Sequence, residues 1–388
     1  MIARGLLTSC LLLGILQGQD KSQELGDRLK ATVTYLASDD LKGRRVGTPE
    51  GEQAGRWMAE QFQKIGLKKG APDGYLQKFK SGGEDAPQGF NVLGLLEGAT
   101  DEVVVLCAHH DHIGIRDGKI HNGANDNASG CAVLLEVARS CAALKDKPRR
   151  SLLFCSFDGE ERMLSGSRYF VNSGLFEMSK VAALVCMDMM GGNFFPRDTT
   201  SLYVLGAENS PELAEVLKKI PRIDGLDPRP MGVNLIEPMG EDFARSDYGS
   251  FRLKRVPFVF LSTGQPWTYH KPEDDVERLN FPKLERSVAF TARLLLDLAA
   301  LEVRPKYAKR EGLGIDDLHG ISGTLKRFLE HPEDLDVKDE ELTALKETVA
   351  RIDEIVKSGE VRPADSETLS KLGRTLMTLA GRRPKNEK

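Results

Sequence analysis

The chain lacks a surplus of basic residues, and this limits the partners that it can bind. Its 54 Lys and Arg residues are outnumbered by 58 Asp and Glu residues, and the formal net charge is −4. A nucleic-acid footprint or a polybasic membrane anchor needs clustered positive charge, so we expect neither kind of partner. A peptide or another small molecule is the more natural substrate for this chain of 388 residues, which is 40% hydrophobic and can bury a large core.

Cysteine is scarce, and its spacing does not suit a metal site. None of the six cysteines forms a C-x-x-C pair. Five of them lie beyond the first residues, each within an apolar run, and their odd number speaks against a disulfide framework. We therefore expect buried free thiols at Cys107, Cys131, Cys141, Cys155 and Cys186.

The first apolar run of the chain is too short to cross a bilayer. Arg4 precedes the uncharged stretch 5–16, which is the pattern of a secretory signal peptide. We expect residues 1–18 to be cleaved near Gly18, which gives an exported protein, periplasmic or extracellular, without a membrane span in its mature form. Lipidation at Cys10 is a weaker alternative, because most of the apolar run follows this cysteine instead of preceding it.

The next part of the chain alternates between helical and strand patterns. Thr48 and Pro49 supply an N-cap and a first helical residue, and apolar residues then recur at helical spacing until Gly66. Continuous apolar runs, which suit strands buried on both faces, follow at residues 91–96, 103–108, 152–157, 181–187 and 256–261. The sequence therefore predicts an α/β fold in residues 25–303, with a mostly parallel, mixed sheet covered by helices on both faces.

Beyond residue 306 the pattern changes to amphipathic helices rich in Lys and Glu. Their apolar positions are Leu318, Ile321, Leu325 and Phe328, then Leu342, Leu345, Val349 and Ile352, and finally Leu369, Leu372, Leu376 and Leu379. We interpret residues 306–388 as a helical C-terminal extension. Its expected role is packing against the main domain or a partner subunit, and not catalysis.

Residues that can carry chemistry follow the ends of the predicted strands. In open α/β sheets, ligands bind in the crevice beyond the carboxyl ends of the strands. His109 and Asp111 come directly after one strand and face the same side of an extended segment. Asp111 can then accept a hydrogen bond from one imidazole nitrogen of His109 while the other binds a metal. Taken alone, a histidine-rich turn is as often an ordinary surface feature.

Carboxylates follow other strands, and each has an ordinary interpretation when taken alone. Asp126 lies where residues 123–130 open a helix, and a helix cap would explain it. The side chains of Glu160 and Glu161 diverge because the residues are adjacent, so one can bind a metal while the other faces the substrate. Such pairs are usually solvated. Asp188 closes an apolar run, where a carboxylate is costly unless it is paired or bound to a metal.

Tyr269 and His270 complete the set after the last predicted strand. Together the segments occur in the order found in the M28 family of zinc peptidases, which the chain resembles over about residues 30–300. Residues 41–44 (Leu-Lys-Gly-Arg) and 75–79 (Tyr-Leu-Gln-Lys-Phe) share in this resemblance. The resemblance implies that residues 25–303 are a peptidase catalytic domain of the zinc-dependent exopeptidase type.

The resemblance also implies a centre with two zinc ions per chain. His109 and Asp188 would bind one ion, Glu161 and His270 would bind the other, and Asp126 would bridge both. This mixture of imidazole and carboxylate donors suits zinc, cobalt or manganese and does not suit calcium.

The remaining roles also come from the resemblance. Glu160 would be the general base, Asp111 would orient His109, and Tyr269 would hydrogen-bond the developing oxyanion. The peptide bond between Asp126 and Asn127 would be cis. The implied activity is hydrolysis of peptide bonds by an aminopeptidase. A carboxypeptidase or dipeptidase of the same family would share all these ligands, whereas a glutaminyl cyclase would use one zinc ion. A binding protein without activity is the remaining alternative.

Two features depart from the pattern of many family members. Only a short polar loop connects Phe79 and Phe90, where several relatives carry an inserted protease-associated domain. Tyr248 stands where relatives often have histidine, which leaves open how the wall of the specificity pocket is formed.

Overall fold

The computed structural model describes residues 19–82, 85–237, 244–362 and 365–385. The predicted signal peptide, residues 1–18, and the alternative lipidation site at Cys10 lie outside these ranges. Among the helices of the described residues, none is both long enough and apolar enough to cross a membrane.

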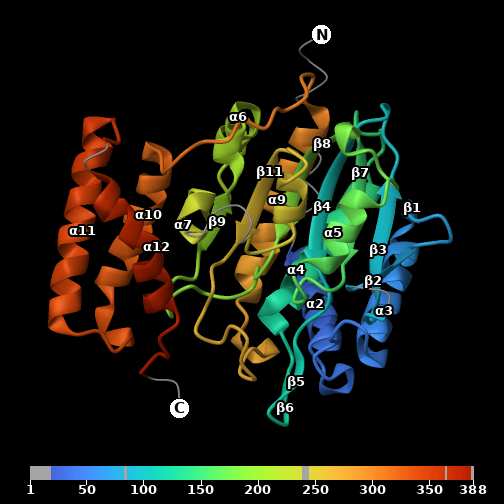
Figure 1. The fold of residues 1–388 in the computed structure, drawn as a ribbon, viewed down its shortest axis with the longest axis horizontal. Helices are drawn as coiled ribbons and strands as arrows, with labels where there is room; N and C mark the ends of the chain where they lie inside the picture. Colours follow the sequence, from blue (N-terminus) through green and yellow to red (C-terminus); the bar gives the residue numbers. More distant parts are fainter. Residues whose placement is uncertain (1–18, 83–84, 238–243, 363–364, 386–388) are drawn as a thin grey trace.

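A sheet of nine strands forms the centre of the described structure, in the order β1-β3-β7-β4-β8-β11-β9-β10, with β2 paired to β3 (Figure 1). The strands are β1 (Lys68–Lys69), β2 (Leu76–Lys80), β3 (Gln88–Leu96), β4 (Val103–His109), β7 (Ser151–Phe157), β8 (Val181–Met187), β9 (Ser201–Leu205), β10 (Asp227–Pro230) and β11 (Phe258–Ser262). A separate hairpin joins β5 (Gly114–Arg116) to β6 (Lys119–His121).

The predicted α/β fold with a mixed sheet is confirmed, and its parallel part is central. Strands β7, β4, β8 and β11 lie side by side and are parallel. Antiparallel pairs occur towards the two edges, where β3 meets β7 and β9 meets β11. All five predicted strands are present, with ends that shift by up to a few residues.

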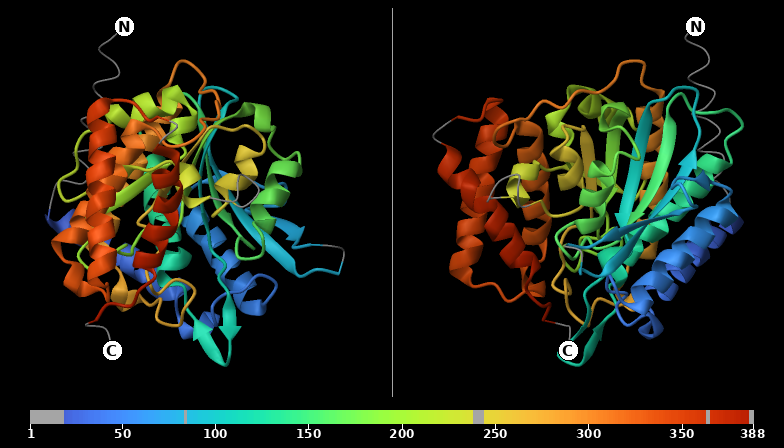
Figure 2. Two further views of the ribbon diagram at one scale, coloured as in Figure 1. Left: turned by 60° about the vertical axis from the view of Figure 1, so that its left-hand side comes forward. Right: turned by 45° about the vertical axis from the view of Figure 1, so that its right-hand side comes forward.

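Helices cover both faces of this sheet (Figures 1 and 2). One face is covered by α2 (Gln19–Leu36), α3 (Pro49–Ile65), α4 (Gly130–Ala142), α6 (Pro211–Lys219) and α9 (Phe281–Ala300). The other is covered by α5 (Ser165–Asn172), α7 (Val233–Ile236) and α8 (Tyr248–Arg252). The helices α10 (Ile315–Glu330), α11 (Asp339–Ser358) and α12 (Ser366–Ala380) continue this layer beyond the β10 edge, where α10 packs against β10 and α12 against α7.

Alternate side chains of each central strand enter the two hydrophobic layers. In β4, Val104 and Leu106 pack into the layer with α2, α3 and α4, whereas Val105 and Cys107 pack into the opposite layer. This alternation follows from the period of two along a strand. It explains why the central strands are recognisable as continuous apolar runs. The five cysteines of the described residues are buried free thiols, as predicted.

The first predicted helix shows how closely local chemistry determines its ends. The Thr48 hydroxyl accepts a hydrogen bond from the Gly51 amide at 3.1 Å, and Pro49 occupies the first turn. Gly66 ends the helix with a φ of 88°, which glycine adopts without the steric cost that a side chain would bring.

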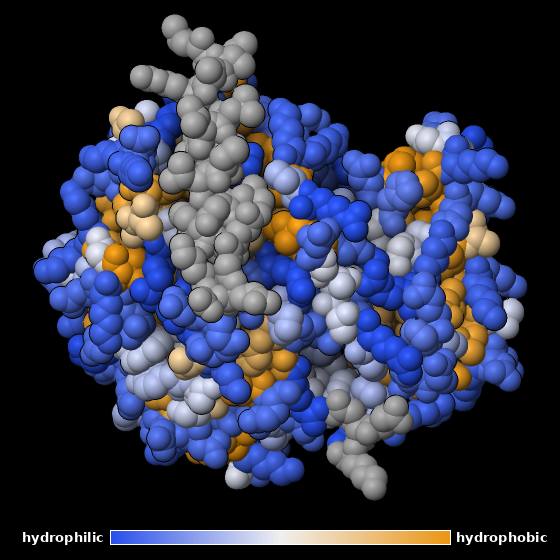
Figure 3. All heavy atoms as spheres, turned by 180° about the vertical axis from the view of Figure 1, so that it is seen from behind, coloured by the Kyte–Doolittle hydropathy of each residue, from blue (hydrophilic) through white to orange (hydrophobic). Residues whose placement is uncertain are grey.

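The three predicted C-terminal helices are present and belong to one of the two hydrophobic layers. The Phe328 ring of α10 lies 5.1 Å from the ring of Phe195, measured between centroids. A Cβ added at Gly320 would lie 1.9 Å from the carbonyl oxygen of Pro230, so only glycine lets α10 lie this close to β10. The division at residue 306 into two domains stays a prediction. Side chains of the extension and of the sheet belong to the same hydrophobic layer. From behind, the molecule is mainly hydrophilic, with apolar side chains in separate patches (Figure 3).

We expect Phe328→Ala to lower the free energy of unfolding of the whole protein by about 3–5 kcal/mol, because it removes a buried ring from this shared layer. Guanidinium-induced unfolding, followed by circular dichroism, measures the change. Glu330→Ala, at an exposed position of the same helix, should change it by less than about 0.5 kcal/mol. An early transition of the extension alone, with the main transition unchanged, would contradict the shared core.

Candidate metal centre and active site

The candidate site lies beyond the carboxyl ends of the four central parallel strands. His109 is the last residue of β4, and Asp188 directly follows β8. Glu160 and Glu161 lie shortly after β7, and His270 lies in the loop that follows β11. Because these strands are neighbours in the sheet and run in the same direction, segments distant in the sequence meet at one edge.

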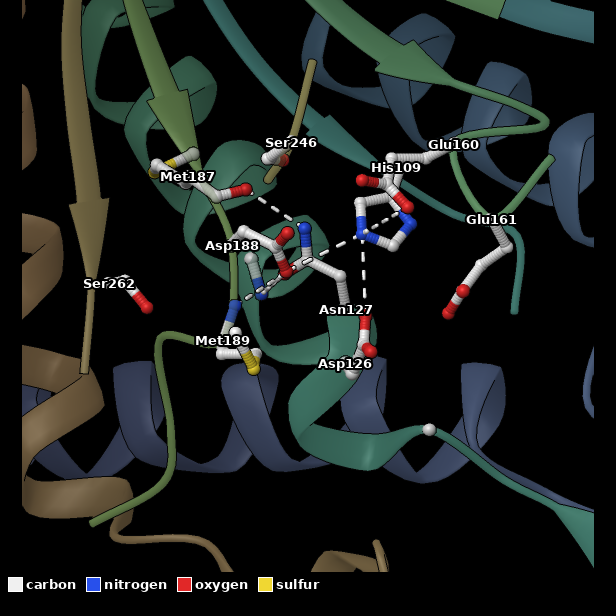
Figure 4. Close-up of polar contacts among 12 residues, drawn as sticks. His109, Asp126, Asn127, Glu160, Glu161, Met187, Asp188, Met189, Ser246 and Ser262 are labelled. Carbon is white, nitrogen blue, oxygen red and sulfur yellow. Dashed lines mark hydrogen bonds and ion pairs between the residues drawn. The ribbon is translucent and has the colours of Figure 1, made fainter. Parts of the chain in front are cut away.

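His109, Asp126 and Asp188 form one half of the site (Figure 4). The Nε2 atom of His109 lies 3.4 Å from Oδ1 of Asp126 and 3.4 Å from Oδ1 of Asp188. All three side chains are at most about one-twentieth exposed. The three donor atoms therefore converge on one buried point.

His270, Glu161 and the second oxygen of Asp126 form the other half. The Nε2 atom of His270 lies 3.3 Å from Oδ2 of Asp126 and 3.0 Å from Oε2 of Glu161. The carboxylate of Asp126 thus has one oxygen in each half. All five residues that the sequence predicts as ligands are brought together.

Two donor atoms of the site are buried without a hydrogen-bond partner. They are Nε2 of His109 and Oδ1 of Asp188. Buried polar atoms are nearly always paired, so unpaired atoms that converge on one place indicate a missing ligand. Zinc at about 2.0–2.2 Å from nitrogen and oxygen donors would separate tetrahedral ligands by about 3.3–3.6 Å. Three of the four observed separations, 3.3 to 3.4 Å, lie in this range, and the fourth, 3.0 Å, is slightly shorter.

The charge balance of the site also favours cations. Burial opposes protonation of His270, but the carboxylates of Asp126 and Glu161 outweigh it and raise the pKa of His270 to about 10. At His109 burial likewise opposes protonation, and the neighbouring carboxylates, Glu160 and Asp188 foremost, raise its pKa well above the usual value. The field of these carboxylates therefore stabilises positive charge at both imidazoles.

Asp111 supports both His109 and the adjacent glutamates. Its Oδ1 atom lies 3.5 Å from Nδ1 of His109, the side on which the sequence predicts it. The same carboxylate also accepts hydrogen bonds from the backbone amides of Glu160 at 3.0 Å and Glu161 at 3.3 Å. Asp111 therefore fixes the position of the two glutamates relative to the histidine.

The predicted base, Glu160, lies beside His109, and the predicted hydrogen-bond donor to the oxyanion, Tyr269, lies beside His270. The Oε2 atom of Glu160 lies 4.0 Å from Nε2 of His109. Burial, together with the charges of Glu161 and Asp188, raises the pKa of Glu160 well above its usual value. The ring of Tyr269 stacks on that of His270 with 3.8 Å between centroids. Burial and the nearby carboxylates also raise the pKa of Tyr269, so its hydroxyl stays protonated.

His112 is a residue of the site to which the sequence analysis assigned no role. It is fully buried, and its Nδ1 atom lies 2.8 Å from Oε1 of Glu161 and 3.9 Å from Oδ2 of Asp126. Three of the four residues from His109 to His112 are histidines. This clustering is the feature of the sequence from which a role for His112 in the site could have been predicted.

Two further buried residues hold the backbone around Asp126. The guanidinium of Arg44 donates to the carbonyl oxygens of His110 at 2.6 Å, Gly123 at 2.7 Å and Asp126 at 3.2 Å. Arg44 belongs to the Leu-Lys-Gly-Arg segment noted in the sequence, but nothing there revealed its role. Asp274 accepts hydrogen bonds from the backbone amides of Asn125 at 2.9 Å and Asp126 at 3.0 Å. No sequence signal pointed to this carboxylate, whose pKa burial raises to about 6.

The turn that carries Asp126 is also tied to the end of β8. The side-chain amide of Asn127 donates to the carbonyl oxygen of Met187 at 2.9 Å and accepts from the amide of Met189 (Figure 4). The peptide bond between Asp126 and Asn127 is cis, as the resemblance implies. These contacts place the Asp126 carboxylate next to that of Asp188.

Tyr248 has no part in the site. It is fully buried, its ring stacks on Phe258 with centroids 4.9 Å apart, and its hydroxyl bonds to Glu237. This tyrosine is therefore a core residue beneath the sheet, and the specificity wall must be formed by other residues.

Solved structures of several peptidases share this fold. The LapA aminopeptidase of Legionella pneumophila matches with a TM-score of 0.60 and 19% identity over 78% of this chain and 76% of that one. The zinc aminopeptidase BSAP of Bacillus subtilis matches with a TM-score of 0.52 and 15% identity over 69% of this chain and 94% of that one. At these identities the likeness shows that this chain shares the fold of the two aminopeptidases.

Relatives in sequence include proteins named as aminopeptidases and one named as a carboxypeptidase. A "Probable leucine aminopeptidase" of Arthroderma benhamiae is 30% identical over 62% of this chain and 63% of its own length. "Aminopeptidase YwaD" of Bacillus subtilis is 26% identical over 54% of this chain and 44% of its own length. A "Probable glutamate carboxypeptidase" of Arabidopsis thaliana is 30% identical over 55% of this chain and 32% of its own length. The matches thus span less than two thirds of these relatives.

The sequence model of peptidase family M28 matches residues 91–295, just over half of the chain. The chain belongs to peptidase family M28, as the resemblance of its motifs indicated. The matched segment contains all five of the candidate ligands.

The role of Asp274 can be tested without any metal. Asp274→Ala leaves the buried amides of Asn125 and Asp126 without an acceptor, so we expect it to lower the free energy of unfolding of metal-free protein by about 1–3 kcal/mol. Denaturant unfolding in the presence of a chelator measures this change. Glu277→Ala, at an exposed position nearby, should have almost no effect. Equal stabilities of the two variants would show that Asp274 does not hold this turn.

Proposed function

We propose that this protein is a two-zinc aminopeptidase, which hydrolyses the first peptide bond of peptides with a free amino terminus. The observation that carries the proposal is the position of Asp126. Its carboxylate has one oxygen 3.4 Å from His109 and the other 3.3 Å from His270. A carboxylate shared between two sets of donors is the arrangement expected for a pair of metal ions.

The proposal assigns His109, Asp126 and Asp188 to one zinc ion, and Asp126, Glu161 and His270 to the other. When bound, such a pair of ions polarises the scissile carbonyl and makes a water molecule more acidic. His112 contacts Glu161 and would fix the orientation of that ligand, as groups that contact metal ligands commonly do.

Glu160 is the general base of the proposed reaction. Its carboxylate lies close to those of the first set of donors, and the proposal gives it the role of base instead of ligand. The hydrogen bonds that the amides of Glu160 and Glu161 donate to Asp111 set its position. Glu160 takes a proton from the attacking water and then passes a proton to the leaving amine. The neutral hydroxyl of Tyr269 donates a hydrogen bond to the oxyanion that develops on the carbonyl.

Recognition of an amino terminus is supported by the charges around the site. With Asp126 and Asp188 assigned to zinc, Glu160 remains as a carboxylate beside the centre that attracts an ammonium group and repels a terminal carboxylate. Arg44 is fully buried and donates to backbone carbonyl oxygens, so it is not available to a substrate. Arg245 is exposed and lines a small cavity that Met189 and Tyr269 also line, so it is a cation that the alternative carboxypeptidase activity would need.

Peptides blocked at either end separate the alternatives. We expect zinc-loaded protein to cleave peptides with a free amino terminus, whether or not their carboxyl end is amidated, and to leave N-acetylated peptides intact. Mass spectrometry of the products gives the bond that is cut. Cleavage of N-acetylated peptides from the carboxyl end would favour a carboxypeptidase, and cleavage of dipeptides alone would favour a dipeptidase. Conversion of N-terminal glutamine to a cyclic product would favour a glutaminyl cyclase.

The role of Glu160 predicts a loss of turnover without a loss of metal. Glu160→Gln preserves the size of the side chain and leaves all five proposed ligands in place. We expect kcat to fall by about 10²- to 10⁴-fold, with little change in KM, because the proton transfer is needed in the transition state. Zinc content should stay at the wild-type value.

Glu161→Gln is the matched control for this experiment, since it makes the same change at the next residue. We expect it to weaken one zinc site and to be partly rescued by excess zinc. Near-normal kcat in Glu160→Gln would contradict the assignment of the base. A loss of zinc from Glu160→Gln, with none from Glu161→Gln, would show that the two roles are reversed.

A further inference from the structure

A small cavity of about 70 Å³ adjoins the candidate active site. Met189, next to the candidate ligand Asp188, and Tyr269, next to the candidate ligand His270, both border it. Ser262, at the end of β11, borders it as well, and Figure 4 places Ser262 and Met189 beside Asp188. The cavity is therefore placed to receive the side chain of the substrate residue that precedes the scissile bond.

Most of the cavity wall is apolar. Phe194, Tyr203, Leu205 and Phe260 contribute to it from the sheet and from the loop after β8, and each of them is at most 6% exposed. Arg245 is the one charged residue among the described residues that line it. Such a surface favours an aliphatic group over a charged one.

The wall on the far side comes from the C-terminal extension. Leu376 and Met377 of α12 line the cavity together with Gly373. Leu376 is 3% exposed, whereas Met377 is only partly buried. A Cβ added at Gly373 would lie 2.1 Å from the carbonyl oxygen of Leu235. Glycine at this position therefore lets α12 pack directly on α7, which brings Leu376 and Met377 to the cavity.

The extension also contacts the loop that carries Tyr269 and His270. The guanidinium of Arg383, which follows α12, lies 4.9 Å from the ring centroid of Trp267. Lys271 of the same loop lies 5.2 Å from this ring. Cation–π contacts of this kind are attractive, so the end of the extension holds the loop beside the cavity.

We propose that the C-terminal extension completes the pocket for the first side chain of the substrate, with Met377 as the residue that sets its depth. This inference rests on the proposed aminopeptidase function and assigns a role in specificity to a region for which the sequence predicted packing alone. A cavity of roughly 150 Å³ is known to hold benzene. The pocket has about half that volume, so it suits an aliphatic side chain of three or four carbons, such as that of valine or leucine, better than an aromatic ring.

Substitution of Met377 tests this proposal. Met377→Phe fills the pocket, so we expect kcat/KM for leucine p-nitroanilide to fall at least about tenfold relative to that for alanine p-nitroanilide, within the range that hydrophobic pockets produce. Thr378→Phe introduces the same ring at the next, exposed position of α12 and should leave this ratio unchanged. Met377→Ala enlarges the pocket and should raise kcat/KM for phenylalanine p-nitroanilide relative to the leucine substrate.

A second measurement does not depend on turnover or metal. Isoamyl alcohol carries the isobutyl group of leucine, and we expect saturation-transfer NMR to detect its binding to metal-free wild type and to Thr378→Phe, but not to Met377→Phe. Thermal unfolding at the wild-type temperature would show that the variants are folded.

These experiments distinguish failure of the pocket assignment from failure of the proposed aminopeptidase function. Wild-type turnover with an unchanged leucine-to-alanine ratio in Met377→Phe would overturn the pocket assignment and leave the aminopeptidase function intact. Absence of turnover of every aminoacyl substrate by zinc-loaded wild type would overturn the proposed function, and the substrate role of the pocket with it.

Discussion

Burial of several carboxylates at one edge of the sheet is the constraint on which the rest of the site depends. Asp126, Glu161 and Asp188 are each no more than about one-tenth exposed, and like charges in such surroundings repel one another strongly. A buried carboxylate is costly unless a cation or hydrogen-bond donors balance it. Imidazoles converge on the same points, and divalent ions would compensate the remaining charge. The buried carboxylates at the ends of the four strands therefore strongly favour the binding of positive charge.

The backbone around this charge is held by hydrogen bonds with buried polar side chains. Arg44 and Asp274 are both buried, and they bind carbonyl oxygens and amides on either side of Asp126. Asp111 does the same for the two glutamates. Each of these side chains carries charge, but its partners are backbone groups of the site. The positions of the proposed ligands thus depend on hydrogen bonds that connect loops from different strands.

The central strands could be predicted because they are buried on both faces, as the run from Val181 to Met187 illustrates. The edge strands β1 and β10 could not be predicted in this way. Strand β1 has two residues, both exposed lysines, and β10 contains two prolines, so neither has an apolar run. They are strands because neighbouring strands supply hydrogen-bond partners, a tertiary effect that local pattern does not contain.

The same distinction applies to the site and to the extension. The five proposed ligands could be predicted because each belongs to a motif, whereas Asp274 acts through its position in space. Leu376 was recognised as an apolar position of a helix, but the sequence gives no indication of what that helix packs against. Its place at the cavity depends on the close approach of α12 to α7 that Gly373 permits.

Anomalous scattering at the zinc absorption edge, from crystals of zinc-loaded protein, tests the central claim most directly. The account predicts two peaks, one on each side of the Asp126 carboxylate. The first would be bound by His109 and Asp188, and the second by Glu161 and His270. A single peak, or peaks away from Asp126, would contradict the two-metal centre on which the proposed activity rests.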